Sequence, residues 1–148
     1  MILLTKKTMV FGQAIEQIFP YVTNMENYMD WFPGVVSIES TDDLPPATKG
    51  KRYQEYLSLP EGNVSLVIEV KESKINECFY TEGDLSPVLP AMLMEFKRLG
   101  SNGTEFNLSY YARNTELTSD SNIIKGLRED LSGRIATAEL NLSARYCR

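Results

Sequence analysis

The C-terminal part of the chain carries an apolar repeat with the period of an α-helix. Between Ser121 and Tyr146, apolar residues recur at spacings of 3, 4, 4, 3 and 4. They are Ile124, Leu127, Leu131, Ile135, Ala138 and Leu142. This spacing predicts one long amphipathic helix, and the preceding TSDSN offers several N-cap residues. Such a helix must bury its apolar stripe, so the rest of the chain has to supply a matching apolar face.

That face is predicted in the middle of the chain, where the apolar period changes to two. In the segment NVSLVIEVKES, one parity is apolar and consists of Val64, Leu66, Ile68 and Val70. The other parity is mostly polar, which is typical of a strand with one buried face. The same reasoning predicts six more strands, at 2–11, 35–40, 51–59, 77–83, 90–99 and 104–113. Pro60-Glu61-Gly62 and the segment 100–103 are expected to be hairpin turns.

Two short helices are predicted between the first two strands. The segment 13–22 has apolar residues at helical spacing, and Pro20 should kink this helix or end it early. Thr23 and Glu26 have the spacing of a capping box. They predict a second helix over about 24–32.

The stretch NYMDWFPGVV holds the only tryptophan, Trp31, and ends the second helix. Pro33 favours an extended Phe32, and Gly34 permits a positive φ at the corner. The next segment can then leave as a strand. Trp31, Tyr28 and Phe32 are therefore expected to pack this corner rather than to bind a substrate.

Length and charge limit the class of protein. A chain of 148 residues without linker or repeat is expected to form a single domain, 1–148. Its net charge of −5 argues against binding to nucleic acid or to anionic lipid surfaces. The N-terminal MILLTKK has too few consecutive apolar residues for a signal peptide or a membrane span. We expect a cytoplasmic protein without stable membrane insertion.

The chain contains no histidine, which limits the catalytic and metal-binding chemistry open to it. Ser-His-Asp and Cys-His nucleophile systems and histidine-containing zinc sites are excluded. The two cysteines, Cys78 and Cys147, lack metal-ligand spacing and are expected to be unpaired thiols. The glycines form no phosphate-binding motif. We therefore expect neither a metal nor a cofactor.

The N-terminal half resembles a known superfamily. The segments are IEQIFPYVTNMENYMDWFPGVVSIES and, with Gly50 leading the third strand, KGKRYQEYLSL. They resemble the helix-helix-strand signature of the SRPBCC superfamily, which contains START-like lipid-binding domains, polyketide cyclase/aromatases, coenzyme Q-binding proteins and the birch pollen allergen group. The hairpins and the final helix follow in the family order. Many members carry proline near the start of the first helix, whereas here Pro20 lies late in it, which affects the cavity rim expected near Tyr21.

The resemblance implies an α+β helix-grip fold. A seven-stranded curved antiparallel sheet would wrap around the long C-terminal helix, with two short helices between strands 1 and 2. An apolar cavity would lie between the sheet and that helix. Polarizable methionines and tyrosines on the inner face suit an apolar ligand with a polar end.

Strand parity predicts which side chains face such a cavity, if Leu66 and Ile68 face inward. The candidate ligand-binding residues are Tyr53, Glu55, Leu57, Leu66, Ile68, Met92, Met94, Phe96, Leu108, Tyr110, Leu127 and Leu131. Phe106 shares their face. The alternative is that all of them form an ordinary filled core.

Glu55 is the candidate catalytic residue, because its parity places a carboxylate among apolar side chains. A buried carboxylate needs a partner, for which Arg52, Arg98, a tyrosine hydroxyl or a ligand are available. The alternative is that the strand twists at YQEY and Glu55 reaches solvent.

Three functions of different classes remain open. The first is a carrier, sensor or sequestering protein for a small hydrophobic or lipid-like ligand, which requires only a cavity. The second is a polyketide cyclase/aromatase-like enzyme that uses Glu55 with Tyr53 or Tyr110 to move protons. The third is a protein-interaction module of the coenzyme Q-binding or ribosome-associated type, which would use strand edges or the Trp31 corner. We favour the first, because the enzyme requires a base and Glu55 is the one candidate.

Overall fold

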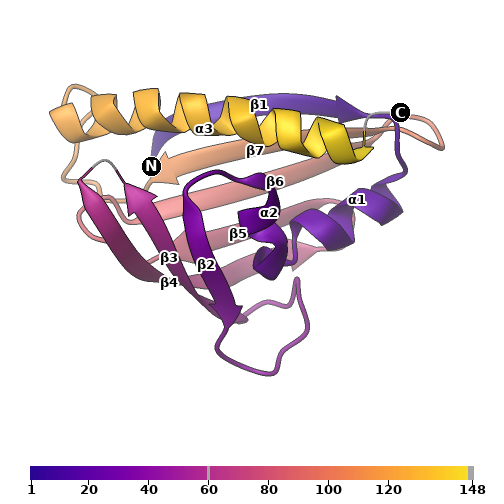
Figure 1. The fold of residues 1–148 in the computed structure, drawn as a ribbon, viewed down its shortest axis with the longest axis horizontal. Helices are drawn as coiled ribbons and strands as arrows, with labels where there is room; N and C mark the ends of the chain where they lie inside the picture. The colour runs from indigo at the N-terminus through magenta and orange to yellow at the C-terminus, as the bar shows by residue number, and fades with distance from the viewer. Residues whose placement is uncertain (60, 147–148) are drawn as a thin grey trace.

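One curved antiparallel sheet lies against one long helix, with short helices between the first two strands (Figure 1). The computed structural model describes residues 1–59 and 61–146. In chain order the elements are β1 (Ile2–Phe11), α1 (Ile15–Val22), η1 (Met25–Asn27), α2 (Tyr28–Trp31), β2 (Val35–Ser40), β3 (Arg52–Leu59), β4 (Gly62–Lys74), β5 (Cys78–Gly83), β6 (Pro90–Arg98), β7 (Thr104–Ala112) and α3 (Asn122–Tyr146). Their types and order confirm the predicted α+β helix-grip fold. Two positions with predictions, Pro60 in a hairpin turn and the thiol of Cys147, lie outside the described residues.

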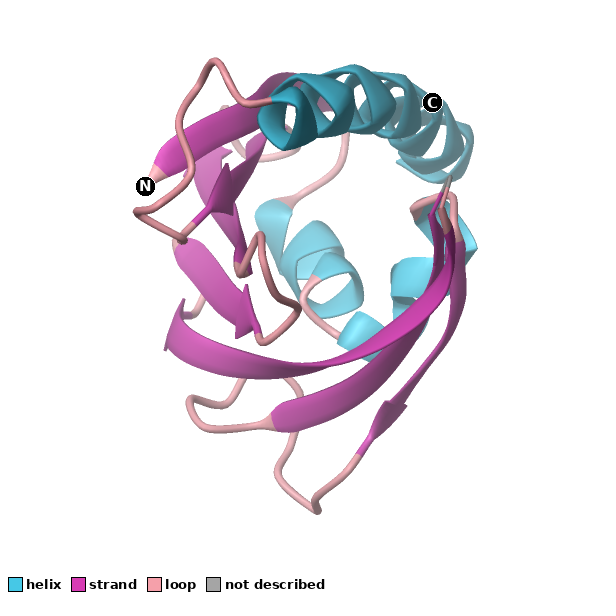
Figure 2. Ribbon diagram, turned by 90° about the vertical axis from the view of Figure 1, so that its left-hand side faces the viewer, coloured by secondary structure: helices cyan, strands magenta, loops and turns pink. Residues whose placement is uncertain are grey.

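The strands pair in the order β1-β7-β6-β5-β4-β3-β2, so β1 and β2 are the edge strands of this sheet. The pairing register shifts at three places, between residues 3 and 5, 35 and 37, and 70 and 72. Such irregularities bend a strand and increase its twist. Figure 2 shows the resulting curvature, with the sheet bending around the short helices and α3 lying across the open side.

The inner face of the sheet carries the apolar parity of the strands. In β4, Leu66, Ile68 and Val70 are buried, as the alternation predicts. In β6 and β7 the inward parity is likewise buried and consists of Met92, Met94, Phe96, Phe106, Leu108 and Tyr110. The predicted faces of these strands are therefore correct.

The apolar stripe of α3 is buried along only part of its length. Ile124 and the more C-terminal Ile135, Ala138 and Leu142 are buried, whereas Leu127 and Leu131 are only partly covered. The sequence pattern does not distinguish these two leucines from the others. The interruption marks the part of the helix that faces a cavity.

The junction between α1 and η1 differs from the prediction. The hydroxyl of Thr23 donates a hydrogen bond to the Phe19 carbonyl at 2.6 Å, so Thr23 closes α1 and does not cap the next helix. Asn24 is the N-cap, and its side-chain oxygen accepts a hydrogen bond from the Glu26 amide at 3.2 Å. The capping-box prediction was wrong because a threonine hydroxyl can also bond to the carbonyl four residues before it.

The helices themselves also differ in detail. α1 continues through Pro20 to Val22, so the proline does not end it early. The predicted second helix is divided into a 3₁₀ turn, η1, and a single α-helical turn, α2. Both segments still lie between β1 and β2.

The corner after α2 has the predicted geometry. Phe32 is extended, with φ −105° and ψ 120°, and Gly34 has a φ of 90°. The Trp31 side chain is 1% exposed and packs edge-on against the ring of Tyr28, with 5.1 Å between the ring centroids. Its carbonyl accepts a hydrogen bond from Asn141 of α3 at 3.1 Å. The tryptophan therefore joins the corner to the long helix.

Within the described residues, no helix combines the length and the apolar character needed to cross a bilayer. α3 is long enough, but it alternates apolar and charged residues along its whole length.

Candidate ligand-binding cavity

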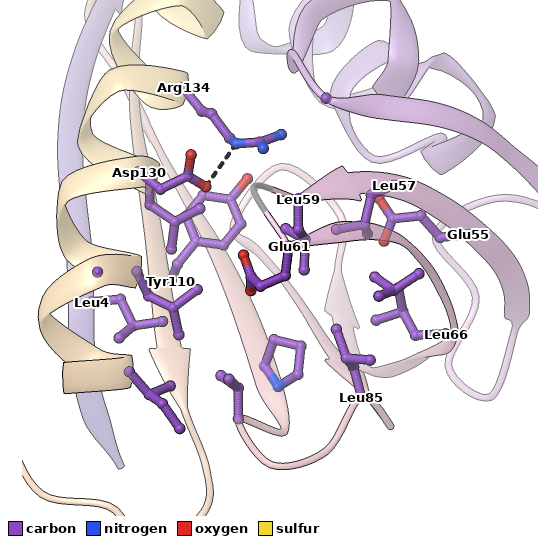
Figure 3. A pocket seen from close by; sticks show the side chains of 18 of the residues that line it. Leu4, Glu55, Leu57, Leu59, Glu61, Leu66, Leu85, Tyr110, Asp130 and Arg134 are labelled. Carbon is purple, nitrogen blue, oxygen red and sulfur yellow. Dashed lines mark hydrogen bonds and ion pairs between the residues drawn. The ribbon is translucent and has the colours of Figure 1, made fainter. Parts of the chain in front are cut away.

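A cavity of about 570 Å³ lies between the sheet, the first half of α3 and the corner after α2. This volume is within the range of small-molecule sites in proteins. Figure 3 shows side chains from the sheet, the helix and the loop after β5 directed into it. Most of the wall is apolar and includes Leu4, Leu57, Leu59, Val64, Leu66, Leu85, Val88, Leu127 and Leu131.

The predicted ligand-binding residues divide into three groups. Those that line the cavity are Glu55, Leu57, Leu66, Tyr110, Leu127 and Leu131. Ile68 and Met92 line a smaller hollow of about 60 Å³, which shares Glu55, Leu66 and Tyr110 with the cavity. Tyr53, Met94, Phe96 and Leu108 line neither space and are buried in the packed core.

The last group faces the same side of the sheet but is covered by the protein itself. The ring of Phe19 in α1 packs edge-on against the ring of Phe96, with 5.0 Å between the ring centroids. The rings of Trp31 and Phe106 also meet edge-on, with 6.5 Å between their centroids. The short helices thus fill one half of the concave face and leave the other half open. Contact of any of the candidate residues with a ligand stays a prediction.

Several cavity residues were not singled out from the sequence. The sequence pattern places Tyr28 at the corner alone and indicates no role for the loop that contains Leu85 and Val88, yet all three residues line the cavity. Asp130 and Arg134 of α3 also line the cavity. Their spacing of four residues on a helix was a visible signal for an ion pair.

Glu55 is buried in the cavity wall, with 4% of its surface exposed. Its cross-strand neighbours are the apolar Ile38 and Leu66. The alternative, in which the strand twists and Glu55 reaches solvent, is therefore wrong. Burial away from water disfavours the charged carboxylate and raises the pKa of Glu55 to about 7.

The two arginines considered as partners of Glu55 are engaged elsewhere. Arg52 pairs with Glu69 at 3.0 Å, and Arg98 pairs with Glu16 through two hydrogen bonds. Across residues 1–59 and 61–146, no hydrogen bond or ion pair involves the Glu55 side chain. The carboxyl group is thus available to a molecule inside the cavity.

Two tyrosines stand beside Glu55. The hydroxyls of Tyr28 and Tyr110 are hydrogen bonded to each other at 2.5 Å, and both residues line the cavity. Burial is the main cause that raises the pKa of both hydroxyls well above the ordinary value, and the nearby Glu55 raises both further. They are therefore neutral at physiological pH and act as hydrogen-bonding groups.

Arg134 fixes α3 to the strand ends at the cavity rim. Its Nε donates to Asp130 at 2.8 Å, Nη1 to the Pro33 carbonyl at 3.0 Å and Nη2 to the Ser58 carbonyl at 2.7 Å. Figure 3 shows the dashed Asp130–Arg134 contact above the apolar wall. The guanidinium thus holds the helix, the corner and β3 at a fixed separation.

The arrangement combines an apolar enclosure with one unpaired acid at a pKa near neutrality. It can hold an apolar body and bind a polar group at Glu55, or exchange a proton with it. Among the described residues, no group of three or more cysteine and acidic side chains is placed to hold a metal ion.

No protein-family model matches the sequence, and no curated protein matches it either. Solved structures match over nearly the whole chain. A START superfamily protein from Mycobacterium smegmatis has a TM-score of 0.73 at 16% identity and covers 96% of this chain and 95% of its own. The protein Ara h 8.0201 has a TM-score of 0.66 at 9% identity, and the match covers 94% of this chain and 97% of Ara h 8.0201.

A third similar structure is BexL, a di-domain ARO/CYC protein, with a TM-score of 0.73 at 8% identity. The match covers 94% of this chain but 46% of that longer one. At such low identities the likeness defines the fold and leaves the activity open. The chain has the same helix-grip fold as these START-like structures, which confirms the fold that the sequence resemblance implied.

Proposed function

We propose that this protein binds a small hydrophobic or lipid-like ligand between the sheet and α3, as a carrier, sensor or sequestering protein. The observation that carries the proposal is the interrupted burial of the α3 stripe. Leu127 and Leu131 continue a buried apolar stripe, yet they face a space of about 570 Å³. An apolar occupant would remove this wall from water and stabilise the complex.

The likeness to a START superfamily protein over most of both chains supports this proposal. So does the position of the cavity, which lies between the sheet and the long helix. The polar groups of the wall are few and are placed to orient a ligand, as is usual for sites of this size.

The test uses native mass spectrometry and a fluorescent probe. Protein purified without denaturation should carry an extractable lipid-like mass, and the uncharged dye N-phenyl-1-naphthylamine should bind with increased emission. Gly126→Leu should abolish dye binding, because Gly126 lines the cavity and its Cβ position is unobstructed. Gly133→Leu is the matched control, since Gly133 lies on the same helix away from the cavity.

Two results would contradict the proposal. One is an empty protein that does not bind the dye. The other is equal dye binding by both variants, which would place the dye outside the cavity. Either result would favour the interaction module, which needs no internal ligand.

A cyclase/aromatase-like enzyme is the second candidate. The buried Glu55, with a pKa of about 7, can accept or donate a proton near neutral pH, and the Tyr110 hydroxyl lies in the same wall. The structural likeness to BexL also supports this candidate. Wild-type protein and Glu55→Gln would be incubated with a poly-β-ketone thioester. A cyclised product formed by the wild type and lost in the variant would favour the enzyme over the carrier.

A further inference from the structure

The charged side chains around the cavity are mostly acidic. Glu55 lies in the wall, and Glu61 and Asp130 also line it. Arg134 is the one cation among the described lining residues. Figure 3 shows Glu55 and Glu61 on the strand side, with Asp130 and Arg134 together on the helix side.

Arg134 uses three of its five N–H groups within the protein. Each of its three nitrogens donates a hydrogen bond to a protein oxygen, on Asp130, Pro33 or Ser58. Nη1 and Nη2 each keep one further N–H, but a carboxylate or phosphate that approached them would also approach the carboxylate of Asp130. An anionic ligand head is therefore disfavoured.

Glu55 has the opposite property, because it is buried and has no protein partner in the described chain. Its sheet neighbours, Ile38 and Leu66, offer no side-chain donor. The hydroxyls of Tyr28 and Tyr110 are bonded to each other. A buried carboxylate without a partner is unfavourable, and a cation that reaches it supplies both charge and hydrogen bonds.

We propose that the ligand of this cavity carries an ammonium group, which Glu55 binds, while its apolar body lies along Leu57, Leu66 and the α3 leucines. This inference rests on the proposed function and adds the chemical class of the ligand. The Tyr28–Tyr110 pair lies beside the ammonium position and can accept a further hydrogen bond from it.

The pH dependence follows from the groups that face Glu55. They are Tyr28 from α2 and Tyr110 from β7. Three further charged residues border the same cavity: Asp130 and Arg134 of α3, and Glu61 in the turn between β3 and β4. The tyrosine pKa values are raised, so both rings stay neutral across the tested range. Glu55, with a pKa of about 7, changes its charge within that range. An alkylammonium ion, whose pKa resembles that of lysine at about 10.4, does not.

The experiment compares decylamine, decanol, 2-decanone and decanoate as competitors of N-phenyl-1-naphthylamine. At about pH 8 decylamine should bind about tenfold more tightly than decanol, the gain typical of a charge-assisted hydrogen bond. Decanoate should bind more weakly than decanol. As the pH falls to about 5.5, the affinity of decylamine should approach that of decanol as Glu55 becomes protonated.

Two matched variants assign the effect to Glu55. Glu55→Gln should reduce the preference for decylamine over decanol to about twofold. Glu61→Gln removes the same charge from an exposed residue of the same cavity wall and should keep the preference. The pH series on the wild type tests the same inference without any substitution.

The outcomes separate the two proposals. Failure of the dye and of all four competitors to bind would overturn the proposed function. Binding of the dye and decanol, with decylamine no tighter than decanol, would overturn the ammonium inference alone. Tightest binding of 2-decanone would also overturn it, because a protonated Glu55 would then act as a hydrogen-bond donor.

Discussion

Arg134 occupies the space that a side chain on Gly34 would need. A Cβ built at Gly34 would lie 1.4 Å from Nη1 of Arg134, far inside any contact distance. That nitrogen donates to the carbonyl of Pro33, so the guanidinium rests directly on the backbone of the corner. Gly34 therefore serves two purposes, a positive φ and the close approach of α3 to the sheet.

Gly34→Ala should destabilise the protein by about 3 kcal/mol, which combines backbone strain with lost hydrogen bonds of Arg134. Gly50→Ala is the matched control, because Gly50 has nearly the same φ of +93° but nothing within 4 Å of its Cβ position. It should cost about 1–2 kcal/mol. Urea denaturation measures both losses. Equal losses would show that the approach of Arg134 contributes nothing to stability.

Trp31→Ala should cost about 3–5 kcal/mol, because the ring is 1% exposed and its removal leaves a large cavity. Val36→Ala, on an exposed side chain of the following strand, should change stability by less than about 0.5 kcal/mol. Thermal and urea denaturation provide the comparison. A Trp31 variant that melts like the wild type but no longer binds the dye would assign Trp31 to the binding site.

Gly126→Ala and Gly133→Ala should each stabilise the protein by about 1 kcal/mol, the difference in helix propensity between the two residues. Both glycines lie inside α3, and neither Cβ position has an atom within 4 Å. Denaturant midpoints of the two variants would measure the gain. A loss of stability at either site would mean that the glycine is needed for a contact made in solution.

Much of the fold could be predicted because period and parity are local properties. The alternation in β4 correctly placed Leu66 and Ile68 on the inner face. The helical spacing located α3 to within a residue. The corner geometry at Gly34 followed from the conformational limits of proline and glycine.

The cavity could be predicted only in part, because parity states which face a side chain is on and not what covers that face. Met94 and Leu57 share the inner face, yet Met94 is in the packed core and Leu57 lines the cavity. The difference depends on where the short helices pack and on how strongly the sheet curves. The loop with Leu85 closes the cavity through contacts distant in sequence, which no local pattern encodes.

Glu55→Gln should stabilise the protein at high pH and leave it nearly unchanged at low pH. Burial raises the folded-state pKa of Glu55 from 4.5 to about 7, so below pH 4.5 both states are protonated and the residue has no charge-related cost. As the pH rises from 4.5 to 7, the unfolded chain loses this proton while the folded protein keeps it, so stability falls by about 3 kcal/mol in total and stays lower above pH 7. The neutral glutamine removes this cost.

Urea denaturation at about pH 4 and pH 8 should therefore give a stability difference between Glu55→Gln and the wild type that appears only at the higher pH. Glu61→Gln, on an exposed side chain, should change stability little at either pH. Equal effects of Glu55→Gln at both pH values would show that the Glu55 carboxyl is solvated in the folded protein.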